Sequence, residues 1–358
     1  MNRTRFLDAL IRQRRYCERR SPLYGAILDA LEEDARNGAA WLGSIETAWK
    51  ARTFAVEWEA PHLLLACMHA CALKGVAPEL AAVYPSCGGS GPPGAAATAF
   101  LRRADTAFWE SVRFNLMQTN EADRGLIWMM VAAPAFRRGD LPFHLVELGA
   151  SAGLSLIGDH LSLACRFTTA RGKPAKPPPR WTKPGRVLTR TGLDVEPRRL
   201  SDPADYLWIK ACVWADDLAR LARLERAAKL FIRLEKTRAG PSLVRCGLSD
   251  APEWLRARRR PRAGEGLVVF NCSSTAFLGD AEYARLRRGM FRALAPWNGR
   301  AVWAEFELPR GPRSGAHELS IHRVAGSRLR TRVLAAMAAD PKEVRLLDGW
   351  ERPWDPIS

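Results

Sequence analysis

The segment 143–153, Phe-His-Leu-Val-Glu-Leu-Gly-Ala-Ser-Ala-Gly, constrains the fold more than any other part of the chain. It predicts a short apolar strand that runs into a turn of small residues and then into a helix. Small side chains let a backbone approach a ligand closely, and the free N–H groups at the start of a helix attract negative charge. The segment therefore predicts an α/β fold with a ligand site at residues 149–153.

Two chemistries share this pattern. Read as Glu147-x-Gly149-x-Ser151-x-Gly153, it is typical of the first loop of a Rossmann-type methyltransferase that uses S-adenosylmethionine (SAM), although Ser151 stands where a glycine is usual. Read as Gly-x-Ser-x-Gly over residues 149–153, it is the nucleophile elbow of an α/β-hydrolase. A plain strand-to-helix turn, with Ser151 capping the helix, is the third interpretation.

The surrounding sequence favours the SAM site. A hydrolase elbow follows several strands and an oxyanion loop of the His-Gly-Gly type, whereas residues before 141 predict helices. The nearest Gly-rich segment, 87–94, lacks the histidine and reads as a Pro/Gly linker. A catalytic triad would also need a later histidine, His317 or His322. A serine hydrolase using Ser151 is the alternative.

The chain is predicted to have two parts. Residues 1–140 form an α-helical region or lid, because apolar residues recur at helical spacing over 5–20, 21–36, 60–75, 95–117 and 119–137, and Ser21-Pro22 is a good helix start. Residues 141–358 form a Rossmann-like doubly wound α/β sheet. Its predicted strands are 143–148, 187–193, 243–246, 266–272, 300–308 and 317–324. Its predicted helices are 153–163, 202–235 (as one helix or two), 281–295 and 328–339, and the Pro-rich basic segment 166–185 is predicted to be an inserted loop.

The charge of the chain suits an anionic partner. The net charge is +17, and arginines gather in segments 256–262 and 285–288. Nucleic acid is one candidate partner. A solvated basic surface in an Arg-rich chain is the other interpretation.

Other composition features argue against a membrane protein and a metalloprotein. No apolar run approaches the ~20 residues of a membrane span, and no signal peptide follows Met1, which predicts a cytoplasmic protein. The eight cysteines include no Cys-x-x-Cys pair. Cys67-x-His69-x-Cys71 is predicted to lie in a buried helix, and no metal site is expected.

The predicted SAM site assigns a role to each loop residue. Glu147 would steer the ammonium group of the ligand. The amides of residues 149–153, those of Gly149, Ala150, Ser151 and Gly153 among them, would face its tail. Asp194, at the end of the second strand, is predicted to accept hydrogen bonds from ribose hydroxyls, with a turn residue as the alternative.

Acceptor-side residues are predicted after later strands. Asn271 follows the strand 267–270, where it would orient an acceptor next to Cys272. Glu305 is a candidate general base that shares a strand face with Glu307, unless it lies on an exposed edge. Gln118, Asn120 and Arg124 would either bind substrate or cap a helix.

Several blocks, in order, resemble a bacterial family known as domain of unknown function 2332 (DUF2332). The resemblance implies a helical segment followed by a methyltransferase-like Rossmann domain, and it implies no particular reaction. The chain departs from the family pattern at three places: Arg198-Arg199 and Cys246 stand where acids are expected, and Asn271-Cys272 stands where His-Ser is expected. The matching blocks are Ser21-Pro-Leu-Tyr24, Pro61–Ala66, Ala81–Ser86, Gln118–Glu121 with Arg124, Glu147–Leu154 with Asp159, Gly192–Pro197, Trp214 and Val268–Phe270.

The sequence thus predicts a SAM-dependent methyltransferase with an unidentified acceptor, either a small molecule or nucleic acid. A serine hydrolase and a non-catalytic protein that binds a ligand or nucleic acid on a degenerate Rossmann scaffold are the alternatives. The sequence predicts no oligomeric state.

Overall fold

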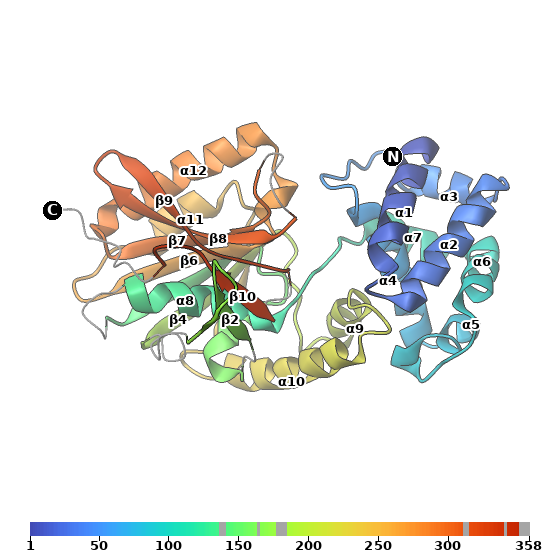
Figure 1. Cartoon of the computed structure of the whole chain (residues 1–358), viewed down its shortest axis with the longest axis horizontal. Helices are drawn as coiled ribbons and strands as arrows, with labels where there is room; N and C mark the ends of the chain where they lie inside the picture. The colour runs from blue at the N-terminus through green and yellow to red at the C-terminus, as the bar shows by residue number, and fades with distance from the viewer. Residues whose placement is uncertain (136–140, 163–164, 177–184, 311–314, 340–341, 351–358) are drawn as a thin grey trace. The chain divides into compact units, whose positions relative to one another are not determined.

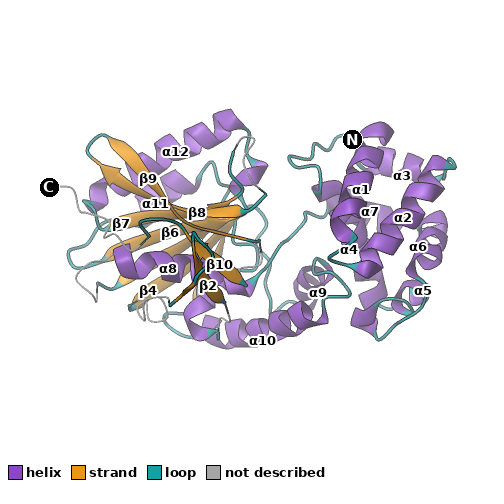
Figure 2. Cartoon of the chain, in the orientation of Figure 1, coloured by secondary structure: helices purple, strands orange, loops and turns teal. Residues whose placement is uncertain are grey.

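The computed structural model describes residues 1–135, 141–162, 165–176, 185–310, 315–339 and 342–350. The chain forms two compact units, Met1–Thr119 with Arg199–Arg226 and Asn120–Arg198 with Ala227–Ser358. We call the first the helical unit and the second the sheet unit (Figures 1 and 2). Residues 120–135, which the sequence grouped with the helical region, belong to the sheet unit, and residues 199–226 belong to the helical unit.

The helical unit is built around helix α4 (Glu59–Leu73), which is buried on almost every side. A helix that is apolar all round lies inside a bundle. Ser21 caps α2 by accepting a hydrogen bond from the Tyr24 amide, as the Ser-Pro start predicts. Asp105 begins a new helix, so the predicted helix 95–117 is two helices. The unit also contains α1 (Arg3–Cys17), α2 (Pro22–Arg36), α3 (Trp41–Ala48), α5 (Pro78–Ala81), α6 (Pro93–Arg103), α7 (Thr106–Phe114), α9 (Pro203–Ala211) and the start of α10 (Leu218–Glu235).

The Cys67-x-His69-x-Cys71 segment lies in α4, as predicted. Cys67 and His69 are buried, and the His69 ring contacts Ser86 Oγ at 2.8 Å through Nε2. Within the described residues, no three metal-ligating side chains gather in one place. Across the same residues, no helix combines the length and the apolar character needed to cross a membrane.

The sheet unit holds a ten-stranded mixed sheet in the order β3-β2-β10-β9-β8-β7-β6-β1-β4-β5. Five of its strands are parallel and stand in the order β5-β4-β1-β6-β7. Because the chain moves to one side of β1 and then to the other, the carboxyl ends of β1 and β6 flank a topological switch point. These strands are β1 (Phe143–Leu148), β4 (Val187–Asp194), β5 (Pro241–Arg245), β6 (Gly266–Cys272) and β7 (Ala301–Glu307).

Helices cover both faces of the parallel strands (Figure 1). Helix α8 (Leu126–Ala135) packs on the face that carries Leu145 and Phe270, which we call the α8 face. Helices α11 (Ala251–Arg258) and α12 (Asp280–Leu294) pack on the face that carries Val146 and Val269, which we call the α12 face. Successive residues of a strand point to opposite faces, so residue number decides which face a strand residue occupies.

Two predictions differ from the structure in the part of the sheet beyond β7. The predicted helix 328–339 is strand β9 (Arg328–Met337), which pairs antiparallel with β8 (His317–Ala325) and with β10 (Glu343–Leu346). The segment 166–185 is not only a loop, because β2 (Arg166–Thr169) and β3 (Pro174–Ala175) form a hairpin whose β2 pairs with β10. Residues 177–184 lie outside the described part.

Candidate functional site

The loop after β1 turns back over the end of β4. The amides of Gly149 and Ala150 both donate to Leu193 O, at 2.8 and 3.1 Å. Gly149, Ser151 and Gly153 have left-handed backbone angles, with φ of 72°, 52° and 71°. Glycine adopts this conformation without strain, whereas serine does so at some cost. The loop is therefore tight and its shape is set by its sequence.

The loop amides are occupied by acceptors of the protein itself. Beyond the two bonds to Leu193, the Ser151 amide donates to Asp194 Oδ2 at 2.7 Å and the Ala152 amide to Asn120 Oδ1 at 3.1 Å. The Gly153 amide donates to Ala150 O at 2.7 Å. In this conformation each of these amides already donates a hydrogen bond within the protein, so a ligand would have to displace an internal acceptor to reach it.

The helix predicted over 153–163 is also different. The chain forms a short 3₁₀ helix, η3 (Leu154–His160), interrupted by non-helical angles at Ile157. Gly158 of this helix lies against Gly125, since a Cβ on Gly158 would lie 2.7 Å from the Gly125 Cα. A short, broken helix supplies little of the dipole that was expected to attract an anion.

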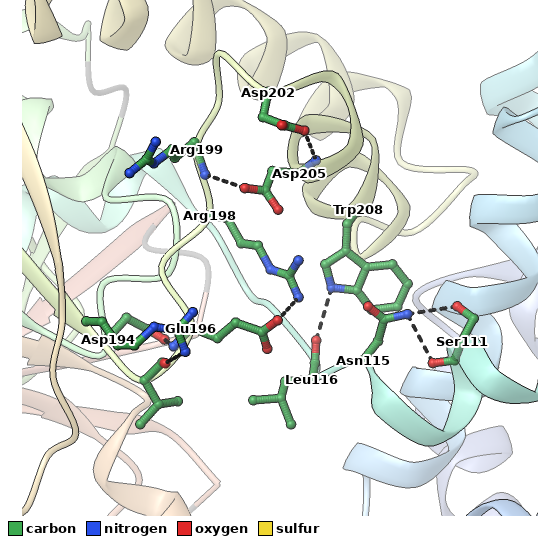
Figure 3. A network of polar contacts seen from close by, with 12 residues as sticks. Ser111, Asn115, Leu116, Asp194, Glu196, Arg198, Arg199, Asp202, Asp205 and Trp208 are labelled. Atoms are coloured by element: carbon green, nitrogen blue, oxygen red, sulfur yellow. Dashed lines mark hydrogen bonds and ion pairs between the residues drawn. The ribbon is translucent and has the colours of Figure 1, made fainter.

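Asp194 anchors this loop. Its Oδ2 accepts from the Ser151 amide, and its Oδ1 accepts from the Glu196 amide at 2.8 Å. Figure 3 shows Asp194 beside Glu196, whose carboxylate accepts a hydrogen bond from Arg198 at 2.6 Å. A ribose would have to displace these backbone donors to reach Asp194, so the turn interpretation of this residue describes its contacts better.

The chain enters the helical unit directly after Arg198. The Arg199 amide donates to the Asp205 carboxylate at 2.8 Å, and Trp208 Nε1 donates to Leu116 O at 3.0 Å (Figure 3). Arg198 and Arg199 are the residues that stand where the family pattern led us to expect an acid. The Arg198 side chain makes its contact within the sheet unit, and the Arg199 amide makes its contact within the helical unit.

The three residues predicted from the helical region separate. Asn120 lies in the sheet unit, where its Nδ2 donates to Ser151 Oγ at 2.5 Å and its Oδ1 receives the Ala152 amide. It holds the loop and caps no helix. Arg124, 7% exposed, donates from Nε to Ala339 O at 3.1 Å. Gln118 is buried in the helical unit.

Glu147 is a buried acid, and only one of its two carboxyl oxygens accepts a hydrogen bond within the described residues. It is 3% exposed, and its Oε1 accepts a hydrogen bond from Ser155 Oγ at 2.5 Å. Its Oε2 is buried and has no hydrogen-bond partner among the described residues. Burial raises the pKa of Glu147 to about 8, while the Ser155 bond and the Arg124 charge lower it and the Asp194 charge raises it. Sequence reasoning found Glu147 and missed Ser155, which had no signal beyond its place after the loop.

Cys272 shares the α8 face with Glu147. Burial raises its pKa well above the ordinary value, the Glu147 charge raises it further, and the Arg124 charge lowers it. The thiol is therefore protonated and a poor nucleophile. Glu147, Cys272 and Arg124 lie close enough to influence one another electrostatically.

Asn271 lies on the opposite, α12 face and is 0% exposed. Its Nδ2 donates to Glu307 Oε1 at 2.6 Å, and its Oδ1 accepts from Trp303 Nε1 at 2.7 Å. Glu307 Oε1 also accepts from the amides of Ser274 and Thr275, at 2.8 and 3.0 Å. Burial raises the pKa of Glu307 to about 7. Asn271 therefore organises the ends of β6 and β7 with its whole side chain.

Glu305 is buried on the same face, so the exposed-edge interpretation is wrong. It is 3% exposed because β8 continues the sheet beyond β7 and α12 covers it. Its Oε2 accepts from the Tyr283 hydroxyl at 2.7 Å and lies 2.7 Å from His322 Nε2, a contact with the distance of an ion pair but not the direction of a hydrogen bond. Oε1 is buried with no partner in the described chain. Tyr283 gave no signal in the sequence, and His322 was considered only as a triad histidine, not as a partner of Glu305.

Apart from Gln118, which lies in the helical unit, the predicted site residues form two groups on opposite faces of the sheet. The loop, Glu147, Asp194, Asn120, Arg124 and Cys272 form the first group. Asn271 and Glu305 belong to the second. The first group can bind a cation at the switch point, and the second can hold a proton on Glu307.

A comparison with known protein families shows which family the chain belongs to. The sequence model of one bacterial family matches residues 8–344. The chain belongs to that family, DUF2332. The family is described as an uncharacterized protein conserved in bacteria, and the resemblance seen in the sequence blocks is confirmed. No curated protein matches the chain. Because the description of DUF2332 names no reaction, the function has to be argued from the residues.

Proposed function

We propose that the sheet unit binds SAM at the carboxyl ends of β1 and β6 and transfers its methyl group to an acceptor. The observation that carries the proposal is the unpartnered Oε2 of buried Glu147 at the switch point. Doubly wound sheets bind their ligands at such points. A buried carboxyl group with a raised pKa is stabilised by a cationic partner, and SAM carries an ammonium group and a sulfonium.

The residues of the site fit the amino-acid end of SAM better than its nucleoside end. Glu147 fits the ammonium group through its remaining oxygen. Arg124 is buried and near enough to lower the pKa of Glu147, so it fits the ligand carboxylate, which guanidinium groups bind well. The loop amides and Asp194 are already bonded inside the protein, and the proposal gives them the task of shaping the loop.

For methyl transfer, the main task of the protein is to hold SAM and the acceptor in the right relative position. Bound SAM supplies an electrophilic methyl carbon, whose bond to the acceptor forms as its bond to sulfur breaks, leaving a neutral thioether. Glu147 orients the ligand, and the buried surroundings exclude water. Asn271 and the candidate base Glu305 lie on the α12 face, opposite Glu147, so the proposal gives neither a part in proton removal, and the acceptor must be nucleophilic without a protein base. The acceptor is a small molecule or a nucleic acid.

Proton release on binding tests the role of Glu147. With a pKa of about 8, Glu147 carries a proton at pH 7, and pairing with an ammonium group requires the ionised form. We expect SAM binding to release about one proton, measured by calorimetric titration in two buffers of different ionisation enthalpy. Glu147→Gln should release none and should weaken binding by about 10- to 100-fold, which corresponds to a charged hydrogen bond of about 1.5–3 kcal/mol.

Glu307→Gln is the matched control for this titration. Glu307 is also a buried acid with a raised pKa, but it lies on the α12 face. Its variant should keep both the affinity and the released proton. If the folded wild-type protein binds neither SAM nor S-adenosylhomocysteine, the methyltransferase proposal is wrong and a non-catalytic scaffold becomes the better description.

Ser151 keeps a second candidate function open. Its φ of 52° suits the strained nucleophile of a hydrolase elbow. Its hydroxyl, however, accepts a hydrogen bond from Asn120, and an amide cannot act as the general base. We expect no labelling by a fluorophosphonate probe, as read by intact-protein mass spectrometry. Labelling of the wild type that disappears in Ser151→Ala would establish the hydrolase instead.

A further inference from the structure

Exposed arginines lie on α11, on the loop after it, and on α12. The two helices pack on the same face of the sheet, so the sides turned away from the sheet point in the same direction. The two arginine clusters of the sequence therefore lie on, or directly after, elements that cover the same face of the sheet. We call these exposed side chains together the arginine surface, and its members are Arg256, Arg258, Arg260, Arg262, Arg285, Arg288 and Arg292.

The two helices are in direct contact, which brings the clusters together. A Cβ on Gly289 of α12 would lie 2.7 Å from Pro252 Cγ of α11. Arg285 and Arg292 stand four residues before and three residues after Gly289, so they share its side of α12. The α12 arginines therefore border the contact with α11 and continue its basic side.

The charge of this surface is not neutralised by the described part of the chain. None of the seven side chains has a carboxylate there within ion-pair distance. The acids at the start of α12 have other partners: Asp280 pairs with Arg310 at 2.9 Å, and Glu282 accepts from the Gly279 amide at 2.9 Å. Seven arginines against the exposed carboxylates of Glu253 and Glu282 on the same helices leave an excess of positive charge, and such an excess attracts a polyanion.

We propose that the arginine surface binds the phosphate backbone of a nucleic acid. The guanidinium fork matches phosphate oxygens in a bidentate way, and Arg285 to Arg292 span about 10 Å of helix, enough for successive phosphates. Phosphate contacts carry no sequence information, so binding is expected to be independent of base sequence. The proposal does not depend on methyl transfer.

A membrane surface fits this patch less well. A helix that lies on a lipid surface needs large apolar side chains beside its basic ones. The exposed large apolar residues of the described chain all lie outside α11, the following loop and α12. They are Tyr16, Val76, Phe114, Val195, Leu218, Phe277 and Leu308.

Salt-dependent binding tests the proposal on the full chain. A fluorescently labelled 20-base-pair duplex is titrated with protein, and anisotropy gives the affinity at several salt concentrations. The triple variant R285Q/R288Q/R292Q should bind at least tenfold more weakly at low salt. The slope of log affinity against log salt should fall by about 2.7, since each phosphate contact contributes about 0.9.

A second triple variant separates this surface from the overall charge. R5Q/R15Q/R19Q removes three exposed arginines from the helical unit and changes the net charge equally. It should bind the duplex like the wild type. Equal loss in both variants, no duplex binding by the wild type, or binding only to anionic vesicles would each overturn the proposal. Thermal unfolding checks that both variants fold, and unchanged SAM titration in R285Q/R288Q/R292Q keeps this test separate from the proposed methyl transfer.

Discussion

Glu147→Gln is expected to raise the free energy of unfolding by about 3–5 kcal/mol between pH 7 and pH 9, at about 1.4 kcal/mol per pKa unit. The wild-type carboxyl group is 3% exposed, and burial raises its pKa from 4.5 to about 8. Glutamine is neutral at every pH and keeps an oxygen to accept the Ser155 hydroxyl. Like the protonated acid, it leaves one polar atom without a partner. Urea unfolding at pH 5, 7 and 8.5 measures the difference.

The sign of the pH dependence follows from which state holds the proton. Between pH 4.5 and 8, the unfolded chain has ionised Glu147 and the folded protein keeps it protonated. The contribution of this group to stability is therefore fully present below pH 4.5, is lost as the pH rises, and levels off above pH 8. Glu307→Gln should remove a smaller fall that ends near pH 7. If the stability of Glu147→Gln falls in parallel with that of the wild type, the carboxyl group is not buried as described.

Glu147 is expected to affect both the stability of the protein and its affinity for SAM. A buried acid such as Glu147 lowers the stability of the folded protein at neutral pH. Ligand binding is a common reason why a protein contains such a residue. The same variant is expected to gain stability and to lose SAM affinity. Loss of binding in Glu147→Gln therefore cannot be attributed to unfolding, which makes this variant more informative than Asp194→Ala, where the loop itself would lose its anchor.

The central parallel strands β1 and β6 were predictable because each is a short, mostly apolar run bounded by turn residues. The predicted strands 143–148 and 266–272 coincide with β1 and β6. The predicted helix 328–339 failed because its apolar residues from Val333 to Met337 are continuous, and a continuous apolar run has no period that separates a strand from a buried helix. The neighbouring strands β8 and β10 decide the conformation, and that information is not local.

The candidate site was predictable to a similar extent. Glu147, the loop and Asp194 were expected to be neighbours, because the carboxyl ends of adjacent parallel strands meet at one edge of a sheet. The contacts that the side chains of the site make within the protein were not predictable. Asn120 reaches Ser151 across 31 residues and Glu305 meets His322 across 17, and no local pattern announces such contacts. The separation of Glu147 from Asn271 depends on which face each strand residue occupies, which only the register of the strands fixes.

Gly149→Ala is expected to lower the free energy of unfolding by about 3 kcal/mol. Two costs add: a left-handed φ of 72° costs an L-residue about 1–2 kcal/mol, and overpacking costs about 1–3 kcal/mol. The second arises because the new Cβ would lie 2.4 Å from the Cβ of Ser274, at the switch point where the turn after β6 meets the loop. Urea unfolding at pH 6 measures the loss.

Gly264→Ala separates the two costs. Gly264 has nearly the same φ, 76°, but no atom lies within 4 Å of the position that a Cβ would take there, so only the backbone cost of about 1–2 kcal/mol is expected. Adding Ser274→Gly to Gly149→Ala removes the colliding atom, and the double variant should be more stable than the sum of the single effects implies. Equal losses for Gly149→Ala and Gly264→Ala would mean that the turn after β6 does not press on the loop. The switch point would then be open enough to admit a ligand from that side, next to Glu147.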